Sequence, residues 1–490
     1  MNILSLYGVV FYIVILFMLS AFFVKKALNS FEEYSLCGRS LSALFIVFTY
    51  LGTWIGGGTI IGLSSSSYLS GVGQYWILGI PYITGFLFAF LFITRIRKIK
   101  LHSIGDMLAL RYPDYNGVVR IPVAIGIILR NVTMIGMQFS ALSFLITYAF
   151  GIDRNLAILI TFLIITSYTV LSGLWGVVVT DVFQGLLQTF GLVVLLLLSV
   201  KFSGGINAIY EFYHVINKDS FLNLLGANNW MQLLVVYFFT FGIFFLMSDQ
   251  SDWERIYASK TDKTAFWGYL VPLTITLILL LIPAYLGVFQ RVLLTGEVNS
   301  EYAIYSFIME MLTPQMAAFI LISIFAAIMS SADSFMLATG VVFSNDIVKK
   351  FLNKEANDRE MIFWTKFFVV ISGAIGLAFA INIADIMYLW ITGIGIGASM
   401  IIPAYLCAWF SKRVNTRGVL SGMIIGALYC LLWLSNFITF HIEMIFYGMM
   451  LNLIITIIVS YMSQKPPIGI VMSTYYWSPK FDSVTNIPKP

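Results

Sequence analysis

The sequence predicts an all-α membrane protein of about 13 transmembrane helices, and three observations support this prediction. First, 60% of the 490 residues are hydrophobic and only 10% are charged, whereas soluble domains carry about a quarter charged residues. Second, apolar stretches of about 20 residues, the length that crosses a bilayer, recur along the chain. Third, the basic residues gather in alternate loops between these stretches.

Each predicted crossing is an apolar stretch between clusters of charged residues. The first runs straight into Lys25 and Lys26 without a cationic leader or a small-residue cleavage site. We therefore expect it to be a retained helix rather than a cleaved signal peptide. The predicted segments are 5–24, 41–70, 75–94, 119–150, 155–174, 176–202, 230–250, 264–290, 314–345, 361–383, 386–410, 417–438 and 442–463.

The distribution of basic residues predicts the orientation of the chain. With 13 crossings, most of the 28 Lys and Arg fall in loops on one side of the membrane. The positive-inside rule then places the amino terminus outside and the carboxyl terminus in the cytoplasm, in the inner (plasma) membrane of the cell. Arg255 belongs to one of these basic loops in this interpretation. The opposite side carries only Arg154, Lys201, Lys218 and Arg291.

The sequence argues against several other classes of protein. Its cysteines and histidines are too scattered for a disulfide framework or a zinc site, and the net charge of +5 is explained by cytoplasmic loops rather than by a nucleic-acid partner. No enzyme is predicted, because Ser330 has no histidine base on its segment. No obligate protein partner can be inferred. The residues concerned are Cys37, Cys407, Cys430, His102, His214 and His441.

A glycine cluster interrupts the second predicted segment. Gly52, Gly56, Gly57 and Gly58 lie within seven residues of each other near mid-membrane. A face of small residues for helix packing is one interpretation. Three consecutive glycines, however, cost about 1 kcal/mol each in a helix. We therefore predict a discontinuous helix, whose freed carbonyls can coordinate a cation.

The ninth predicted segment carries a second polar cluster. Ser330, Ser331 and Ser334 share one helical face with Ala327, and Asp333 lies among them. Hydroxyl and carbonyl oxygens suit a hard cation such as sodium. The serines could instead only bond their own i−4 carbonyls. The intramembrane carboxylate of Asp333 favours a functional role for the cluster.

Four further polar residues lie at membrane depth. Arg130 and Gln138 cannot face lipid without a large cost. Asp181 lies near the start of the sixth predicted segment, where it could satisfy a helix dipole. Asp249 follows an unbroken apolar run and is expected either to face a cavity or to cap the cytoplasmic end of its helix.

With these features, the chain resembles the sodium:solute symporter family over nearly its whole length. The resemblance rests on stretches 172–177, 180–185 and 326–334, and stretches 53–58 and 329–334 are similar to the choline-transporter branch. It implies a leucine-transporter-like core of two inverted five-helix repeats with discontinuous helices. The implied divisions are 1–40 (extra helix and loop), 41–229 (first repeat with an external loop), 230–410 (second repeat), 411–463 (two extra helices) and 464–490 (cytoplasmic tail).

The resemblance also implies the ion sites for co-transported sodium. The main site would use backbone oxygens of Gly52, Ile55 and Ala327 and the hydroxyls of Ser330 and Ser331. A second sodium, which some relatives hold, would use an acid matching Asp181 and hydroxyls matching Ser330 and Ser334. The chain departs from the hydroxyl pattern by placing Asp333 in that cluster.

The solute is predicted less closely than the ion. Trp54 could offer an aromatic face to a cation, and a buried Asp249 needs a positive partner, which could be the solute, sodium, Arg130 or Arg255. We expect a small amine, quaternary ammonium or amino-acid-like compound; proline, pantothenate, urea, a sugar or sialic acid stay open, as do a channel and a sensor. The expected solute residues are Trp54, Gly56, Gly57, Thr59, Gln138 and Asp249.

Overall fold

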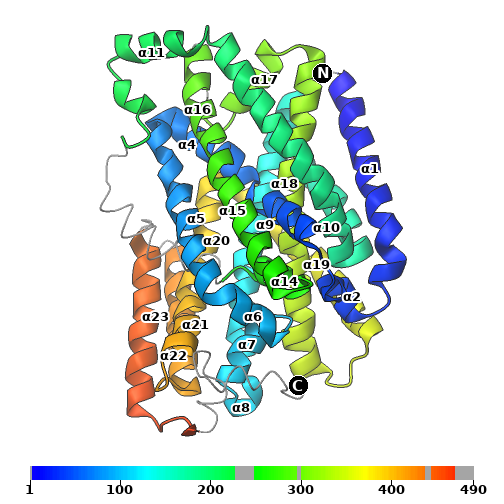
Figure 1. The fold of residues 1–490 in the computed structure, drawn as a ribbon, viewed down its shortest axis with the longest axis vertical. Helices are drawn as coiled ribbons and strands as arrows, with labels where there is room; N and C mark the ends of the chain where they lie inside the picture. The colour runs from blue at the N-terminus through cyan, green and yellow to red at the C-terminus, as the bar shows by residue number, and fades with distance from the viewer. Residues whose placement is uncertain (1–2, 227–247, 295–298, 436–442, 469–490) are drawn as a thin grey trace.

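A computed structural model describes residues 3–226, 248–294, 299–435 and 443–468. In this part of the chain the secondary structure is helical, apart from one isolated parallel bridge between Leu41 and Ser259. Long helices run side by side along the longest axis of the molecule, and short helices gather at its two ends (Figure 1).

The helices follow the order of the predicted segments. Short π or 3-10 helices extend several of them, among them η2 (Gly58–Gly62) and η8 (Phe343–Leu352). The α-helices are α1 (Ile3–Ala27), α2 (Phe31–Leu36), α3 (Ala43–Trp54), α4 (Leu63–Ser70), α5 (Trp76–Phe88), α6 (Thr94–Ile99), α7 (Ile104–Arg111), α8 (Asp114–Gly117), α9 (Arg120–Phe150), α10 (Arg154–Phe202), α11 (Ile206–Val215), α14 (Gln250–Ala258), α15 (Asp262–Leu279), α16 (Leu281–Leu293), α17 (Ala303–Met311), α18 (Pro314–Val342), α19 (Asp358–Asn382), α20 (Ile386–Met400), α21 (Ile402–Phe410), α22 (Thr416–Leu434) and α23 (Glu443–Met462).

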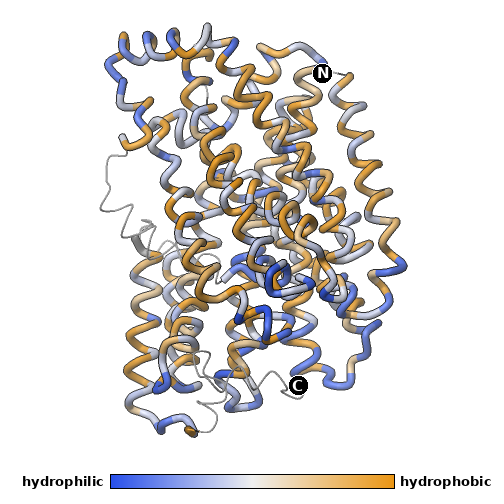
Figure 2. The backbone as a smooth tube through the Cα atoms, viewed as in Figure 1, coloured by the Kyte–Doolittle hydropathy of each residue, from blue (hydrophilic) through white to orange (hydrophobic). Residues whose placement is uncertain are grey.

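The described helices are long and apolar enough to make a multi-pass membrane protein. Nine of them qualify as spans on their own, and two bent pairs raise the number to as many as 11 within the described residues. Large apolar side chains such as Phe22, Phe90 and Leu197 are 81%, 64% and 63% exposed, as expected for a surface that faces lipid. Hydrophobic residues predominate along the long helices, and hydrophilic segments lie toward both ends of the molecule (Figure 2).

The predicted number of 13 crossings differs from this number for two reasons. Segments 155–174 and 176–202 fall in the single 49-residue element α10, which would be about 74 Å long if straight and therefore far longer than one crossing. Gly173 interrupts it with φ 54° and ψ −145°, a conformation that only glycine adopts without strain. Segment 230–250 lies almost wholly outside the described residues, so the number 13 stays a prediction.

The chain between α1 and α3 contacts two distant parts of the molecule. A Cβ atom on Gly173 would lie 2.4 Å from the carbonyl oxygen of Tyr34, so α2 packs directly against the break in α10. The amide of Leu41 donates to the carbonyl of Ala258 at 3.1 Å, and Lys260 donates back to Leu41 at 3.0 Å. The segment after α1 therefore touches both α10 and the end of α14.

Helix α18 lies at the centre of the bundle. Every residue from Ser323 to Val342 is buried, and the helix packs against α1, α3, α9, α10 and α19. The hydroxyl of Thr313 caps its first turn and Pro314 follows at a position that needs no backbone donor. The polar cluster of α18 is thus held inside protein and away from lipid.

Candidate sodium and solute sites

The break predicted from the glycine cluster is present between α3 and α4. Helix α3 ends at Trp54, and the helix of residues 58–70 leaves at an angle of 53°. Side chains bond the freed backbone: Gly57 N donates to Gln138 Oε1 at 2.7 Å, and Gly56 N donates to Thr59 Oγ1 at 2.7 Å. The discontinuous helix therefore survives at membrane depth because buried polar groups satisfy it.

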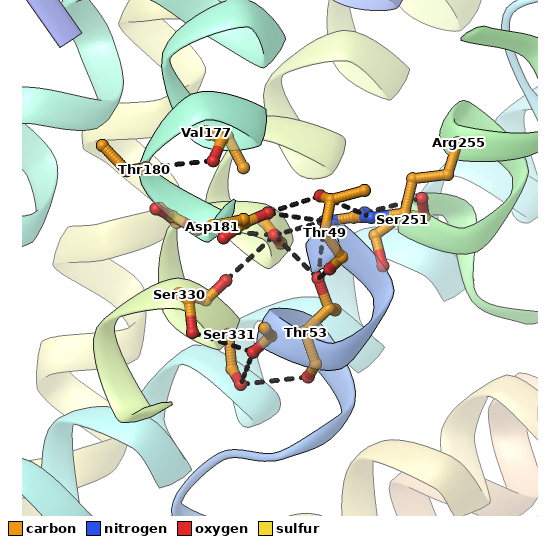
Figure 3. A network of polar contacts seen from close by, with 12 residues as sticks. Thr49, Thr53, Val177, Thr180, Asp181, Ser251, Arg255, Ser330 and Ser331 are labelled. Carbon is orange, nitrogen blue, oxygen red and sulfur yellow. Dashed lines mark hydrogen bonds and ion pairs between the residues drawn. The ribbon is translucent and has the colours of Figure 1, made fainter. Parts of the chain in front are cut away.

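The main sodium prediction concerns the contact between α3 and α18. The hydroxyl of Ser330 donates to Gly52 O at 2.8 Å and lies 3.1 Å from Ala327 O. The hydroxyl of Ser331 lies 3.2 Å from both of these carbonyl oxygens. Four of the five expected ligands therefore meet in one buried place, and Figure 3 shows the two serines facing α3. These oxygens suit sodium, and the ligand set itself stays a prediction.

Ile55 is the one expected ligand that no described contact joins to this group. It follows α3 directly, is 2% exposed, and donates its amide to Leu51 O at 3.3 Å. Its carbonyl belongs to the turn that leads into the glycines. The break thus leaves that oxygen outside the helical ladder, which is what a cation ligand requires.

The carboxylate of Asp181 lies beside this group, with different partners for its two oxygens. Thr49 donates a short hydrogen bond to Oδ2, and Arg255 approaches the same oxygen at 3.6 Å (Figure 3). Among the described residues Oδ1 has no hydrogen-bond partner, and it would lie 3.0 Å from a Cβ atom on Gly52. Asp181 therefore stands between Arg255 and the expected sodium ligands.

The placement of Arg255 in a basic cytoplasmic loop is wrong. Its side chain is 1% exposed and donates to Thr49 Oγ1, Ser334 Oγ and the carbonyl of Ser251. Every residue of α14 is buried, and the sequence pattern Asp-Gln-Ser-Asp-Trp-Glu-Arg hides this because such a run is typical of a solvated helix end.

Asp333, which the sequence placed at the second cation site, contacts α10 and Ser334. Tyr168 donates to Asp333 Oδ2 at 2.7 Å, and Ser334 approaches Oδ1 at 3.4 Å. Ser334 also accepts from Arg255 at 2.7 Å. The structure therefore gathers Asp181 and Ser334 around Arg255, whereas the strongest contact of Asp333 is with α10. That Asp333 holds a cation stays a prediction.

The expected solute residues meet at a small cavity beside the helix break. Its volume is about 30 Å³, which is room for a water molecule or two, so a solute needs the walls to open. Gly57 is adjacent, through its bond to Gln138. The lining includes Trp54, Gly56, Thr59, Gln138 and Asp249, as expected, together with Thr53, Gly58, Leu78, Tyr82, Arg130, Met134, Met137, Phe335 and Trp390.

Arg130 is the positive partner of Asp249. The guanidinium donates to Asp249 Oδ2 at 2.8 Å, and the two side chains are 0% and 2% exposed. Ser251 donates to the other carboxylate oxygen through both its amide and its hydroxyl. Of the partners that the sequence left open, the structure selects Arg130, so a cationic solute is not required to neutralise Asp249.

Trp54 belongs to an aromatic cluster at the edge of the cavity. Its ring lies 4.7 Å from Tyr50, 5.5 Å from Tyr82 and 5.2 Å from Tyr269. Its indole N–H donates to Asp252 Oδ1 at 3.1 Å. Sequence reasoning missed these neighbours, because three tyrosines on separate helices carry no common pattern.

A polar network joins α7, α9 and η8 at the end of the molecule predicted to be cytoplasmic. Arg120 pairs with Asp106 and, at 3.0 Å, with Asp346. Ser103 donates to Asp346 at 2.8 Å, and Asn345 donates to Asp106 at 2.9 Å. These contacts hold the three elements together.

Comparisons with known proteins agree with this geometry. A model of the sodium:solute symporter family matches residues 34–426. The human "High affinity choline transporter 1" is 26% identical over 445 residues, which are 85% of this chain and 74% of the relative. The "Sodium/proline symporter" of Staphylococcus aureus is 24% identical over 480 residues, 92% of this chain and 91% of the relative.

Solved structures show the same fold. A Na+-coupled sialic acid symporter, in a substrate-bound outward-open state, superposes with a TM-score of 0.81 at 19% identity and covers 94% of this chain and 98% of its own. Mhp1, a nucleobase-cation-symport-1 family transporter, superposes with a TM-score of 0.58 at 14% identity, covering 92% of this chain and 97% of its own. The leucine-transporter-like architecture is therefore confirmed.

Proposed function

The chain belongs to the sodium:solute symporter family, and we propose that it imports a small zwitterionic solute, such as an amino-acid-like compound, together with sodium. The observation that carries this proposal is the cavity beside the broken helix. It presents both members of the Arg130–Asp249 pair, and Ser330 and Ser331 lie next to the same break. Ion and solute would therefore act on one discontinuous helix.

The chemistry of the cavity favours a solute with two opposite charges. A guanidinium can hold a carboxylate through two hydrogen bonds, and Asp249 can hold an ammonium. Inserted between them, a zwitterion would exchange one buried ion pair for two and leave no charge uncompensated. Trp54 and Tyr82 would cover its apolar part.

Alternating access follows from the same elements. The network of Arg120 with Asp106 and Asp346 would be the inner gate, and solute would reach the cavity from outside while that gate is closed. A tenfold sodium gradient supplies about 1.4 kcal/mol and 100 mV about 2.3 kcal/mol per charge. One sodium ion could therefore sustain roughly a 500-fold solute gradient. This direction assumes the plasma membrane, with the amino terminus outside.

Uptake into proteoliposomes tests the proposal. Radiolabelled proline, choline, a neutral sugar and sialic acid would be offered with an inward sodium gradient, and again with potassium in its place. We expect accumulation of the zwitterion with sodium only. Equal uptake in potassium would overturn sodium coupling, and preference for choline, the sugar or sialic acid would overturn the assigned solute class.

A further inference from the structure

We propose that Asp252 is a positioning residue, which holds the indole ring of Trp54 in place as a wall of the solute cavity and so limits the size of the solute. The inference rests on the proposed sodium-coupled symport, because it takes the solute to bind in the cavity that Trp54 lines. It deepens that proposal by naming a residue outside the lining that decides which solutes fit.

Two hydrogen bonds join Trp54 to other helices. Its indole N–H donates to Asp252 Oδ1 at 3.1 Å, and its carbonyl oxygen accepts from the hydroxyl of Tyr82 at 3.3 Å. Trp54 and Asp252 are 4% and 0% exposed, so water does not compete for the indole bond. Helix α3 ends at Trp54, and the orientation of this side chain therefore depends on contacts with other helices.

The aromatic neighbours of Trp54 hold its ring less closely than this bond does. The rings of Tyr82 and Tyr269 lie at 66° and 84° to the plane of the indole. Such ring pairs are favourable over centroid distances of about 4.5–7 Å, whereas a hydrogen bond needs its donor and acceptor about 3 Å apart. The bond to Asp252 therefore fixes the position of the indole within the looser aromatic cluster.

The first turn of α14 determines where Asp252 lies. The helix begins directly after Asp249, whose side chain caps it by accepting from the amide of Ser251. Asp252 follows in the same turn, and its carbonyl oxygen accepts from the hydroxyl of Tyr50 at 2.9 Å. One helical turn therefore contributes Asp249 to the cavity lining and Asp252 to the indole of another lining residue.

The arginines of this region donate to residues other than Asp252. Arg130 donates to Asp249, and Arg255 donates to hydroxyls of α3 and α18. Among the described residues the second carboxylate oxygen of Asp252, Oδ2, has no hydrogen-bond partner. The contact that defines this side chain is thus the bond from Trp54, which needs an acceptor oxygen rather than a charge.

Uptake by variants at both ends of the bond tests the inference. Asp252→Asn keeps an acceptor oxygen and Asp252→Leu removes it, whereas Trp54→Phe keeps a ring but removes the N–H donor. In proteoliposomes with an inward sodium gradient, we expect the KM for radiolabelled L-proline to rise roughly 2- to 12-fold in Asp252→Leu and in Trp54→Phe. The reason is that a mobile wall must be ordered when the solute binds. Asp252→Asn should keep the KM of the unaltered chain.

Selectivity and a matched control separate this role from a merely structural one. Inhibition by the larger zwitterion L-phenylalanine should strengthen in Asp252→Leu, and that substitution should have no further effect in a Trp54→Phe chain. Glu254→Gln is the control, because this other buried carboxylate of α14 accepts from Gln250 instead. Additive effects, an equal rise in KM in Glu254→Gln, or a rise in Asp252→Asn as large as in Asp252→Leu would overturn the inference. If Asp252→Leu does not fold, Trp54→Phe compared with Asp252→Asn decides.

A measurement without solute separates the inference from the proposed function. In the ¹⁵N NMR spectrum of the purified full-length chain, the indole signal of Trp54 is identified by its loss in Trp54→Phe. We expect this signal to move in Asp252→Leu and to stay in place in Glu254→Gln. An unmoved signal in Asp252→Leu would overturn the inference even if proline is taken up. Absence of sodium-dependent proline uptake by the unaltered chain would instead overturn the proposed solute class.

Discussion

Among the buried arginine–carboxylate pairs that the structure describes, the two nearest the helix break have different surroundings. Arg130 and Asp249 are 2.8 Å apart and line the solute cavity, among aromatic and methionine side chains. Arg255 and Asp181 are 3.6 Å apart among hydroxyls and do not themselves line the cavity, although Thr53, which accepts from Arg255, does. Of these two pairs, it is the first whose side chains line the cavity, which is why we propose that the solute binds there.

The role of a buried ion pair is therefore indicated by the residues that surround it rather than by its charges alone. Burying an ion pair gains little stability on its own, because desolvation offsets the attraction. A pair that opens onto a cavity is therefore best explained by a ligand. A pair that is closed in by fixed donors and acceptors is best explained by a constant local field.

The largest expected effect comes from breaking the solute pair. Asp249→Asn removes the carboxylate that pairs with the buried guanidinium of Arg130, and breaking a buried pair costs about 3–5 kcal/mol. We expect uptake to fall more than about 100-fold while ²²Na binding is kept, because the sodium ligands are untouched. Full uptake by the double variant Arg130→Met/Asp249→Asn would show that the pair is purely structural and would remove the contrast.

The next effect concerns the serines beside the second pair. Replacing Ser330 and Ser331 with alanine removes two of the oxygens that meet Gly52 O. We expect the sodium concentration for half-maximal uptake to rise about tenfold or more, since each lost ligand weakens ion binding. Ser323→Ala is the matched control, because the hydroxyl of Ser323 donates to Phe319 O of its own helix. An unchanged sodium dependence in the correctly inserted double variant would refute the assignment.

A smaller effect is expected from adding a methyl group at the helix break, between the two pairs. A Cβ atom on Gly56 would lie 2.4 Å from Ser331 Oγ and 2.8 Å from Gln138 Nε2. Gly56→Ala should therefore lower stability by about 1–3 kcal/mol and reduce uptake. Gly62→Ala, whose nearest neighbour is the flexible end of Met387 at 3.3 Å, should behave like the parent protein in a thermal-shift assay. Equal melting temperatures for both variants would contradict the packing described.

The smallest effect lies outside both pairs, at His102 between α6 and α7. Burial lowers the pKa of this imidazole to about 4, although the ring is partly exposed, and it stacks on Phe31. The folded protein therefore resists protonation, and stability present above pH 6.5 is lost as the pH falls toward 4. Between pH 7.5 and pH 5 we expect the free energy of unfolding to fall by about 1 kcal/mol, measured as a thermal shift. This fall should be absent in His102→Gln. A larger loss in the variant would contradict this sign.

Sequence reasoning reached the fold and the helix break because their signals are local, whereas the ion ligands were implied by the family resemblance and stay a prediction. The glycines at 56–58 and the serines at 330 and 331 are close in the chain, and their composition is unusual for a membrane span. The charge pairs are different, because Arg130 and Asp249 are 119 positions apart and either could have had another partner. Only the packing of α9 against the start of α14 decides between those partners.

The break in α10 was hidden for a related reason. A turn at one glycine inside an apolar run leaves no polar loop, so hydropathy predicts two crossings without indicating how they connect. The burial of α14 was missed because its charged residues are typical of a solvated helix end. The predicted boundary near residue 175 agrees with the break at Gly173, but the geometry of that turn is fixed by a distant neighbour, Tyr34, which hydropathy does not reveal.

The residues between α1 and α3 connect two parts of the transporter. They contact the turn at Gly173 in the predicted first repeat and the end of α14, which carries Arg255, in the predicted second repeat. If the repeats move against each other, this connecting segment must either move with one of them or break the two backbone hydrogen bonds at Leu41. We therefore expect the segment between α1 and α3 to affect how fast the transporter cycles, whereas its affinities depend on the sites in the core.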